Sequence, residues 1–235
     1  MTETGKLYLV PTPIGNLKDI TIRAIEVLKQ CPIILAEDTR KAQVLLKTYD
    51  IKPQRLISFF KDNEHARIGL VINLLKEGND IAYITEAGTP GVSDPGYLLV
   101  NACYEHGIEV DCLPGPTALI PALVLSGLPS DRFCFEGFLP RRKWKKRLEE
   151  LRTEPRTMIF YESPFRLAKT LARLSQFLGE GRQGAVIREI SKVHQEVRRG
   201  TLKDLTTYYF ENPPKGECVI VVKGYDEDRA EEDKG

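Results

Sequence analysis

Short apolar runs alternate with amphipathic, helix-like stretches along the whole chain, and this alternation restricts the possible fold more than any other feature. In the first half the runs that have the character of strands are residues 6–11, 33–36, 55–60, 80–85 and 108–113. After the first run, Ile20, Ala24, Val27 and Leu28 recur at helical spacing, with Asp19 as the expected N-cap. Strands separated by helices are joined by crossover connections, so the sequence predicts an α/β fold with a mostly parallel sheet.

A stretch rich in proline and glycine, residues 113–129, is the predicted junction between two domains. We expect an N-terminal α/β domain over 1–114 and a C-terminal α/β domain over 115–235. The spacing in the second half also suits hairpins, which predicts a mixed sheet there. Its expected strands are 133–138, 157–161, 184–189 and 217–224, and its expected helices are 142–152, 164–179 and 202–211. The charged tail from about residue 225 lacks apolar anchors, so we expect it to be disordered.

The bulk composition excludes several classes of protein. The formal net charge is +1, so a surface for an anionic partner must be local. The cysteines are widely spaced beside apolar runs and form no CxxC or Cys/His cluster, which predicts buried, reduced thiols and no metal site. The sequence shows no signal-peptide pattern and no apolar run near the ~20 residues that span a membrane. We expect a cytoplasmic, soluble protein.

Familiar nucleotide-binding and hydrolase motifs are missing from the sequence. It has no GxGxxG after the first strand and no GxxxxGK[ST], HExxH or GxSxG. Their absence argues against a dinucleotide enzyme, a P-loop NTPase, a zinc protease and an α/β-hydrolase. Instead, loops rich in Gly and Pro follow predicted strands at residues 10–16, 86–96 and 113–119. Open α/β sheets bind ligands at the carboxyl ends of their strands, so these loops predict a ligand site.

The loop EAGTPGVSDPG, residues 86–96, indicates the kind of ligand. Its glycines leave bare main chain that a ligand can approach, and its prolines remove amide donors that a phosphate site needs. Glu86 and Asp94 would repel a phosphate but favour a ribose hydroxyl pair or a cation. S-adenosylmethionine, with an adenosine and a positively charged sulfur, fits this pattern. For Asp94 an alternative is equally open, namely that it only caps a turn or a helix start.

The most informative blocks of the sequence are LYLVPTPIGNLKDIT, AEDTR, EAGTPGVSDPG, LPGP, GLPSDRFCFEGFLPRR and RTMIFYESPFR, which lie between about Lys6 and Gly224. Together they resemble the ribosomal RNA small subunit methyltransferase I family, ribose 2′-O-methyltransferases of the tetrapyrrole-methylase superfamily. The resemblance implies a two-domain α/β fold of class III methyltransferases that binds S-adenosylmethionine, usually as a homodimer. It implies as substrate a cytidine ribose in the decoding region of small-subunit (16S) ribosomal RNA, within the assembled subunit. It implies neither DNA nor a membrane as partner.

The resemblance also implies a set of cofactor-binding residues, carried over motif by motif. They are Pro11, Pro13, Ile14, Gly15, Glu86, Gly88, Thr89, Pro90, Val92, Thr117, Ala118, Tyr161, Arg188 and Gly216. The chain departs from the family at Thr85-Glu86, where Ser-Asp is commoner, so the carboxylate is kept on a longer arm. Many members continue beyond the last strand into a helical extension, whereas this sequence ends in an acidic tail.

Methyl transfer from a sulfonium is an in-line displacement in which the protein aligns the reactants and removes a proton from the attacking hydroxyl. The AEDTR block follows a strand, so its side chains are expected at the carboxyl edge of the sheet. Lys61 stands near a place where the family often has a histidine. The catalytic candidates are Glu37, Asp38, Arg40 and Lys61. None can be singled out as the general base, and capping of the next helix is an equal alternative for Asp38.

The segment RRKWKKR stands out from the nearly neutral balance of the chain. It comprises Arg141, Arg142, Lys143, Trp144, Lys145, Lys146 and Arg147. On the predicted helix Arg141 and Lys145 share a face. Cations around a tryptophan suit a surface that follows an RNA backbone and stacks one base, and a solvated helix end is the alternative. A small-molecule, tetrapyrrole-like methyltransferase would not need this segment, and a non-catalytic RNA-binding protein would not need the cofactor loops.

Overall fold

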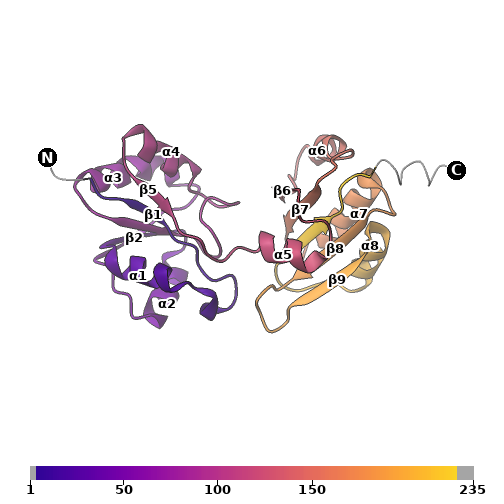
Figure 1. Ribbon diagram of the computed structural model, residues 1–235, viewed down its shortest axis with the longest axis horizontal. Coiled ribbons are helices and arrows are strands. Elements are labelled where there is room, and N and C mark those ends of the chain that lie inside the picture. Colours follow the sequence, from indigo (N-terminus) through magenta and orange to yellow (C-terminus); the bar gives the residue numbers. More distant parts are fainter. Residues whose placement is uncertain (1–3, 227–235) are drawn as a thin grey trace. The chain divides into compact units, whose positions relative to one another are not determined.

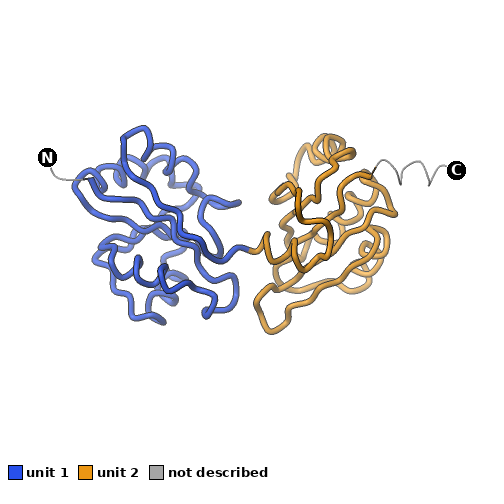
Figure 2. The backbone as a smooth tube through the Cα atoms, viewed as in Figure 1, with its two compact units in different colours: residues 1–117 blue, residues 118–235 orange. Residues whose placement is uncertain are grey.

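The computed structural model describes residues 4–226. The chain divides into two compact units, Met1–Thr117 and Ala118–Gly235, coloured separately in Figure 2. The predicted boundary follows residue 114, whereas the units meet after Thr117. The expectation of a disordered tail falls almost entirely on residues outside the described range.

Unit 1 is built on a five-stranded sheet in which every pairing is parallel, as predicted. The strand order is β3-β2-β4-β1-β5. The strands are β1 Leu7–Leu9, β2 Ile33–Ala36, β3 Arg55–Ser58, β4 Ile81–Ile84 and β5 Val110–Cys112. The helices are α1 Ile22–Gln30, α2 Thr39–Thr48, α3 Glu64–Lys76 and α4 Tyr97–Glu105, with a 3₁₀ turn at Leu17–Asp19.

Helices cover both faces of this sheet, α3 and α4 on one and α1 and α2 on the other (Figure 1). The central strands β2 and β4 are therefore buried along their whole length. Parallel strands covered on both sides need apolar side chains at every position rather than in alternation, which explains the runs IILA and IAYI.

The start of α1 differs from the prediction. Thr21 caps the helix, because its hydroxyl accepts a hydrogen bond from the Ala24 amide at 3.0 Å. Asp19 lies in the preceding 3₁₀ turn instead. Thr21 has an extended backbone, as an N-cap requires, so the helix cannot begin before Ile22.

Unit 2 contains a mixed five-stranded sheet of order β6-β7-β10-β8-β9, as expected. Only β6 and β7 pair in parallel, and the other neighbours are antiparallel. The strands are β6 Phe133–Phe138, β7 Thr157–Glu162, β8 Gln183–Arg188, β9 Glu196–Thr201 and β10 Cys218–Val222. The helices are α5 Leu119–Ser126, α6 Trp144–Glu150, α7 Leu167–Leu178 and α8 Leu202–Glu211.

One apolar core holds unit 2 together. Helices α6, α7 and α8 contribute Leu148, Leu171 and Leu205, which pack on Phe160 and Ile220 of the sheet. Helix α5 packs against β8, β9 and β10. Among the described residues, no helix is long and apolar enough to cross a lipid bilayer.

Three features of unit 2 depart from the expectations. Helix α5 occupies the stretch read only as a junction, and its proline stands in the first turn, where no amide donor is needed. Strand β9 was not predicted, because EVRRGT lacks apolar alternation. Helix α6 begins at Trp144 rather than residue 142, so Arg141 lies outside it and shares no helical face with Lys145.

The cysteines are all unpaired. Cys31, Cys103 and Cys218 are buried, as their apolar surroundings predict, whereas Cys134 is half-buried. Cys112 is exposed, against expectation, because it ends β5, which lies at the edge of its sheet.

Candidate active site

The Gly/Pro loops of unit 1 meet at the carboxyl edge of its sheet. The loops after β1 and β4 pair through two backbone hydrogen bonds of 2.9 Å between Thr12 and Gly88. The Thr12 hydroxyl also donates to the Thr85 carbonyl at 3.2 Å. The loop after β5 joins them, because the Thr89 hydroxyl donates to the Pro116 carbonyl at 3.2 Å. Segments far apart in the sequence therefore form one connected surface of main chain.

Two glycines shape these loops, Gly88 through its positive φ and Gly115 through its close approach to Pro11. Gly88 has a φ of +83°, and a Cβ atom there would stand 3.7 Å from Ile14 Cγ2 and 3.8 Å from the Pro116 oxygen. At Gly115 a Cβ atom would lie only 2.7 Å from the Pro11 Cβ, so a larger residue would force the loops apart. The backbone path, rather than any side chain, sets the shape of this surface.

A cavity of about 130 Å³ opens beside these loops, between them and the start of α2. Thr12, Pro13, Glu37, Lys41 and Glu86 are among its lining residues. Pockets for whole drug-sized ligands have volumes of roughly 300–1,000 Å³, so this cavity has room for one part of such a ligand.

Three carboxylates form an acidic rim: Glu37 and Glu86 line this cavity, and Asp94 lies near enough for the charges of both to raise its pKa. The Glu86 amide donates to Glu37 Oε2 at 3.4 Å, and the Glu86 side chain pairs with Lys41. Burial raises the pKa of Glu37, and the charge of Glu86 raises it further. The pKa of Asp94 rises to about 6, first because of burial and then because of Glu37. The neighbouring Thr85 hydroxyl opposes this rise in the pKa.

The C-terminal end of loop 86–96 is anchored by buried side chains. The buried Glu64 carboxylate accepts the Gly96 amide at 3.1 Å. The Tyr83 hydroxyl donates to the Pro95 carbonyl at 3.2 Å, and its ring meets Phe59 edge to face. Burial, followed by the charge of Glu37, holds the pKa of Tyr83 above its ordinary value. Glu64 and Tyr83 therefore hold the loop in place, and Glu37, Glu86 and Asp94 take no part in these contacts.

The sequence-predicted catalytic residues separate into two groups. Glu37 belongs to the acidic rim. Asp38 caps α2, since its carboxylate accepts the amides of Arg40 at 2.8 Å and Lys41 at 3.4 Å. The Asp38 pKa is lowered by the hydrogen bonds that Arg40 donates. Arg40 is almost fully exposed, and in the described structure Lys61 makes no hydrogen bond or ion pair with the rim.

From the sequence, Asp94 is equally compatible with a ligand contact and with a cap of a turn or a helix start. The structure excludes capping of α4, because the N-cap of that helix is Gly96 and no side chain bonds to its first turn. The signal that distinguishes Asp94 is its burial against Glu37, a residue far away in the sequence. A pattern within the loop could not reveal it.

The expected cofactor residues of unit 2 lie at one edge of its sheet. Tyr161 is the penultimate residue of β7, and the centre of its ring lies 4.8 Å from that of Phe135. Arg188 ends β8 and pairs with Glu196 at 2.6 Å. Gly216 has a φ of +79° just before β10. The strand register brings these positions together, because Cys218 of β10 faces both Glu162 and Arg188.

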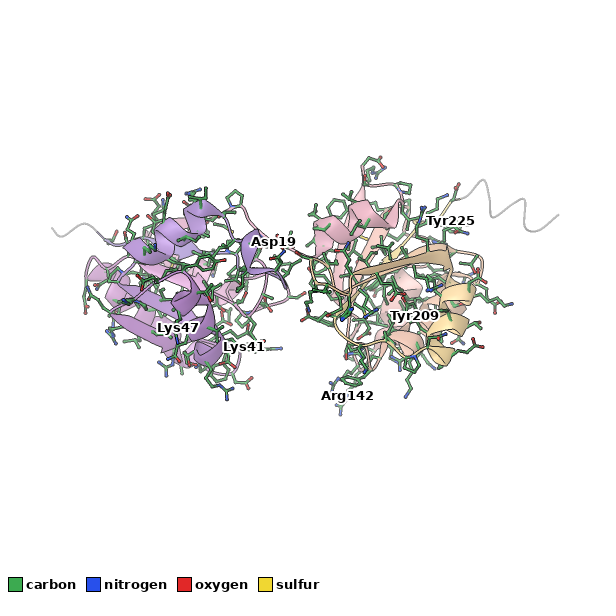
Figure 3. All side chains as sticks on the ribbon, turned by 90° about the horizontal axis from the view of Figure 1, so that it is seen from below. Asp19, Lys41, Lys47, Arg142, Tyr209 and Tyr225 are labelled. Atoms are coloured by element: carbon green, nitrogen blue, oxygen red, sulfur yellow. The ribbon has the colours of Figure 1, made fainter. Side chains whose placement is uncertain are left out.

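Some cations of the basic segment of unit 2 have partners within the described residues, and others do not. Arg147 bridges Glu136 at 2.6 Å and Glu150 at 2.9 Å. The Trp144 ring packs edge to face on Phe177, and the Arg173 guanidinium lies 4.3 Å from its centre. The remaining cations, among them Arg142 in Figure 3, are exposed.

A parallel α/β unit with Gly/Pro loops at its carboxyl edge, followed by a mixed unit, defines the tetrapyrrole-methylase class of fold. Residues 6–206 match the family model of Tetrapyrrole (Corrin/Porphyrin) Methylases. Among solved structures, uroporphyrin-III-C-methyltransferase from Thermus thermophilus is similar, with 22% identity, a TM-score of 0.66, and coverage of 93% of this chain and 94% of that one. Diphthine synthase matches with 14% identity and a TM-score of 0.73, covering 94% and 90% of the two chains.

Relatives in sequence narrow the class to one family. Ribosomal RNA small subunit methyltransferase I of Thermotoga maritima is 47% identical, covering 94% of this chain and 99% of the relative. The proteins of the same name from Synechocystis sp. and Escherichia coli O157:H7 are 48% and 46% identical, over 96% and 94% of this chain and 81% and 78% of theirs. The chain belongs to the ribosomal RNA small subunit methyltransferase I family.

Proposed function

We propose that this protein uses S-adenosylmethionine to methylate the 2′-hydroxyl of a cytidine ribose in the decoding region of small-subunit ribosomal RNA. Three observations support the proposal: the family membership, the names of its relatives, and a similar structure described as complexed with S-adenosylhomocysteine. The observation that carries it is the acidic rim beside bare main chain, because a phosphate site would be basic.

The residues present fit S-adenosylmethionine. The cofactor supplies an electrophilic methyl group on a sulfonium, and carboxylates at the rim complement that positive charge. The one cation at the rim, Lys41, is already paired with Glu86 in the described structure. The bare backbone at Gly88 and the neighbouring prolines would hold the cofactor, together with Pro11, Pro13, Ile14, Gly15, Thr89, Val92, Thr117 and Ala118 from unit 1 and the junction.

Proton removal falls to the acidic rim in this proposal. A general base works best when its pKa lies near the working pH, and the Asp94 pKa of about 6 comes nearer to that than the ordinary value of a carboxyl. Glu37, whose pKa is also raised, is the second candidate. The Asp38 carboxylate is engaged as the cap of α2, so it is not a candidate for the general base.

We assign the RNA contact to the basic segment of unit 2. Arg141, Arg142, Lys143 and Lys146 make no ion pair within the described structure and are exposed. A nearly neutral chain with a local group of unpaired cations suits a polyanion that touches only this part.

The setting of the reaction rests on the family resemblance. We propose that the enzyme acts in the cytoplasm as a homodimer, on RNA within the assembled small subunit and not on DNA. We also propose that the reaction needs no metal, since an in-line displacement by a hydroxyl needs only alignment and a base.

Calorimetry followed by a transfer assay tests this function. The protein is titrated with S-adenosylmethionine, S-adenosylhomocysteine and ATP, and methyl transfer is then measured on small ribosomal subunits and on a tetrapyrrole. We expect the two sulfur ligands to bind, ATP not to bind, and only the subunits to be methylated. Binding of ATP alone, or methylation of the tetrapyrrole alone, would contradict the proposal.

A further inference from the structure

One aromatic ring of unit 2 is almost fully exposed. Phe165 is 93% accessible and lies in the short loop between β7 and α7. This loop stands at the same edge of the sheet as Tyr161, Arg188 and Gly216, which were carried over as cofactor-binding residues. Leaving a phenylalanine ring in water loses the free energy that its burial would provide, so a ligand that covers the ring gains that free energy on binding.

The loop that carries Phe165 is held by a buried carboxylate. The Glu162 side chain is fully buried and accepts the Ser163 amide at 2.8 Å and the Thr170 hydroxyl at 2.6 Å. Arg166 approaches the same carboxylate at 3.4 Å, and its amide donates to the Ser163 carbonyl at 3.0 Å. Phe165 is therefore presented from a fixed turn, which lowers the entropic cost of using its ring as a contact.

The same turn is tied to the chain just before the basic segment. The Arg166 guanidinium donates to the Leu139 carbonyl at 2.8 Å. Leu139 lines a groove of about 460 Å³. Arg142, Lys143 and Lys146 line the same groove. Arg147, which also lines the groove, is neutralised by Glu136 and Glu150. The groove thus keeps three unpaired cations beside an apolar wall.

We propose that this turn and this groove together bind an unpaired stretch of the substrate RNA. Phe165 stacks on a base, and Arg142, Lys143 and Lys146 contact the adjoining phosphates. This inference rests on the proposed RNA substrate. Base stacking on an aromatic ring, combined with a cationic track, is how proteins hold single strands without reading their sequence.

The structure favours Phe165 over Trp144 as the stacking residue. Trp144 is the aromatic that the sequence marks, but its ring already meets Phe177 and the Arg173 guanidinium. A base could stack on that side only by displacing Arg173. The Phe165 ring makes no aromatic or cation–π contact within the described structure.

Fluorescence of a single-stranded RNA carrying 2-aminopurine tests this site, because stacking quenches that base. The variants are Phe165→Leu, Phe165→Tyr and Lys146→Ala, with Tyr104→Leu as a control for an exposed aromatic in unit 1. We expect Phe165→Leu to weaken binding about 5- to 150-fold, to abolish the quench and to leave the salt dependence unchanged. Phe165→Tyr keeps both properties, and Lys146→Ala flattens the salt slope by about 0.7.

Wild-type affinity and quenching in Phe165→Leu would overturn the stacking site, while RNA binding by the wild type would leave the proposed function standing. If the wild type neither binds RNA nor methylates subunits, the proposed function falls and this inference falls with it. The affinity of every variant for S-adenosylmethionine is also measured by calorimetry. An unchanged affinity shows that the substitution has not damaged the rest of the protein.

Discussion

Asp94 is the residue whose chemistry departs furthest from what its position in the sequence suggests. It lies in a loop of glycines and prolines, yet burial and Glu37 raise its pKa to about 6. Ionising the buried Asp94 carboxyl costs free energy. The folded state tolerates this cost because contacts with Glu64 and Tyr83 hold loop 86–96 in place. Retention of an unfavourable charge is typical of functional sites.

Replacing Asp94 with Asn tests this pKa through stability. The folded-state pKa is raised above the ordinary 3.8, so the unfolded chain ionises first, and the folded state loses stability as the pH rises from about 4 to about 6. The Asn variant lacks this loss and should be more stable than the wild type at about pH 7.5 by on the order of 1–2 kcal/mol. That is less than the ~3 kcal/mol that separates a pKa near 4 from one near 6, because the side chain is partly exposed.

Urea unfolding of both proteins between about pH 4 and pH 7.5 measures the difference. The two curves should converge at the acid end. Parallel curves over the whole range would mean that Asp94 ionises as it does in the unfolded chain.

Glu162 provides a second prediction at this scale. Glu162→Ala leaves the Thr170 hydroxyl, the Ser163 amide and the Arg166 guanidinium without their buried partner. We expect it to lower the free energy of unfolding by roughly 2–4 kcal/mol. The exposed Glu217 pairs with Lys192, and Glu217→Ala should change stability by less than ~1 kcal/mol. Equal effects of the two substitutions in denaturant unfolding would contradict the role assigned to Glu162.

Single residues were predictable from sequence only where their partners are local. The cap formed by Asp38 could be read as an alternative because its amide donors lie two and three residues away. The raised pKa of Asp94 and the covered ring of Trp144 depend on Glu37 and Phe177, which the chain brings in from other elements.

At the scale of elements, the loops after β1, β4 and β5 form one connected surface. A substitution at Gly88 tests whether this surface binds the cofactor. Gly88→Ala adds a methyl group in ordinary contact with Ile14 and Pro116, so the loops stay packed while the ligand's path narrows. We expect S-adenosylmethionine to bind about tenfold more weakly or worse. Gly107→Ala is the matched control, since Gly107 also has a positive φ and follows α4 in open space. Both variants carry a similar backbone strain of ~1–2 kcal/mol, so equal calorimetric affinities in the two would reject the assignment.

The basic segment yields a prediction about salt. Replacing Lys143, Lys145 and Lys146 with Ala should weaken RNA binding and flatten its dependence on salt by about 0.7 per lost phosphate contact. The control is the triple alanine variant at Lys29, Lys47 and Lys76, exposed lysines of unit 1 that remove the same charge. Anisotropy titrations across a salt series compare the three proteins. If both triple variants have the same slope, the effect is one of net charge and the segment is only a solvated helix end.

Elements with strong periodicity were predictable, and the exceptions have physical reasons. Residues 202–211 match α8, because Leu202, Leu205 and Tyr209 recur at helical spacing. Residues 133–138 match β6, a short and mostly apolar run of strand length. Strand β9 is stabilised by its register with β8 rather than by its own apolar residues. Helix α5 was not predicted, because the prolines and glycines on both sides of it indicate a loop. A proline in the first turn is nevertheless compatible with a helix.

At the scale of the whole molecule, each unit has its own sheet and its own core. The difference between the sheets was predictable, because crossovers force parallel pairing in unit 1 while hairpin spacing permits antiparallel pairing in unit 2. The candidate site was predictable as a set of loops at one sheet edge. The carboxylates that give it chemical character were not, because their proton affinities arise only from the packed structure.

We propose that the chain methylates a ribose hydroxyl of ribosomal RNA, and chemical analysis of the product is the decisive measurement. Small ribosomal subunits lacking the modification are incubated with the protein and S-adenosylmethionine carrying a labelled methyl group, and the RNA is digested and separated by mass. We predict the label in 2′-O-methylcytidine, in a linkage that alkali cannot cleave because the neighbouring 2′-hydroxyl is blocked. Label on a base, or no label in RNA while a tetrapyrrole is methylated, would show that the ribose hydroxyl is not the acceptor.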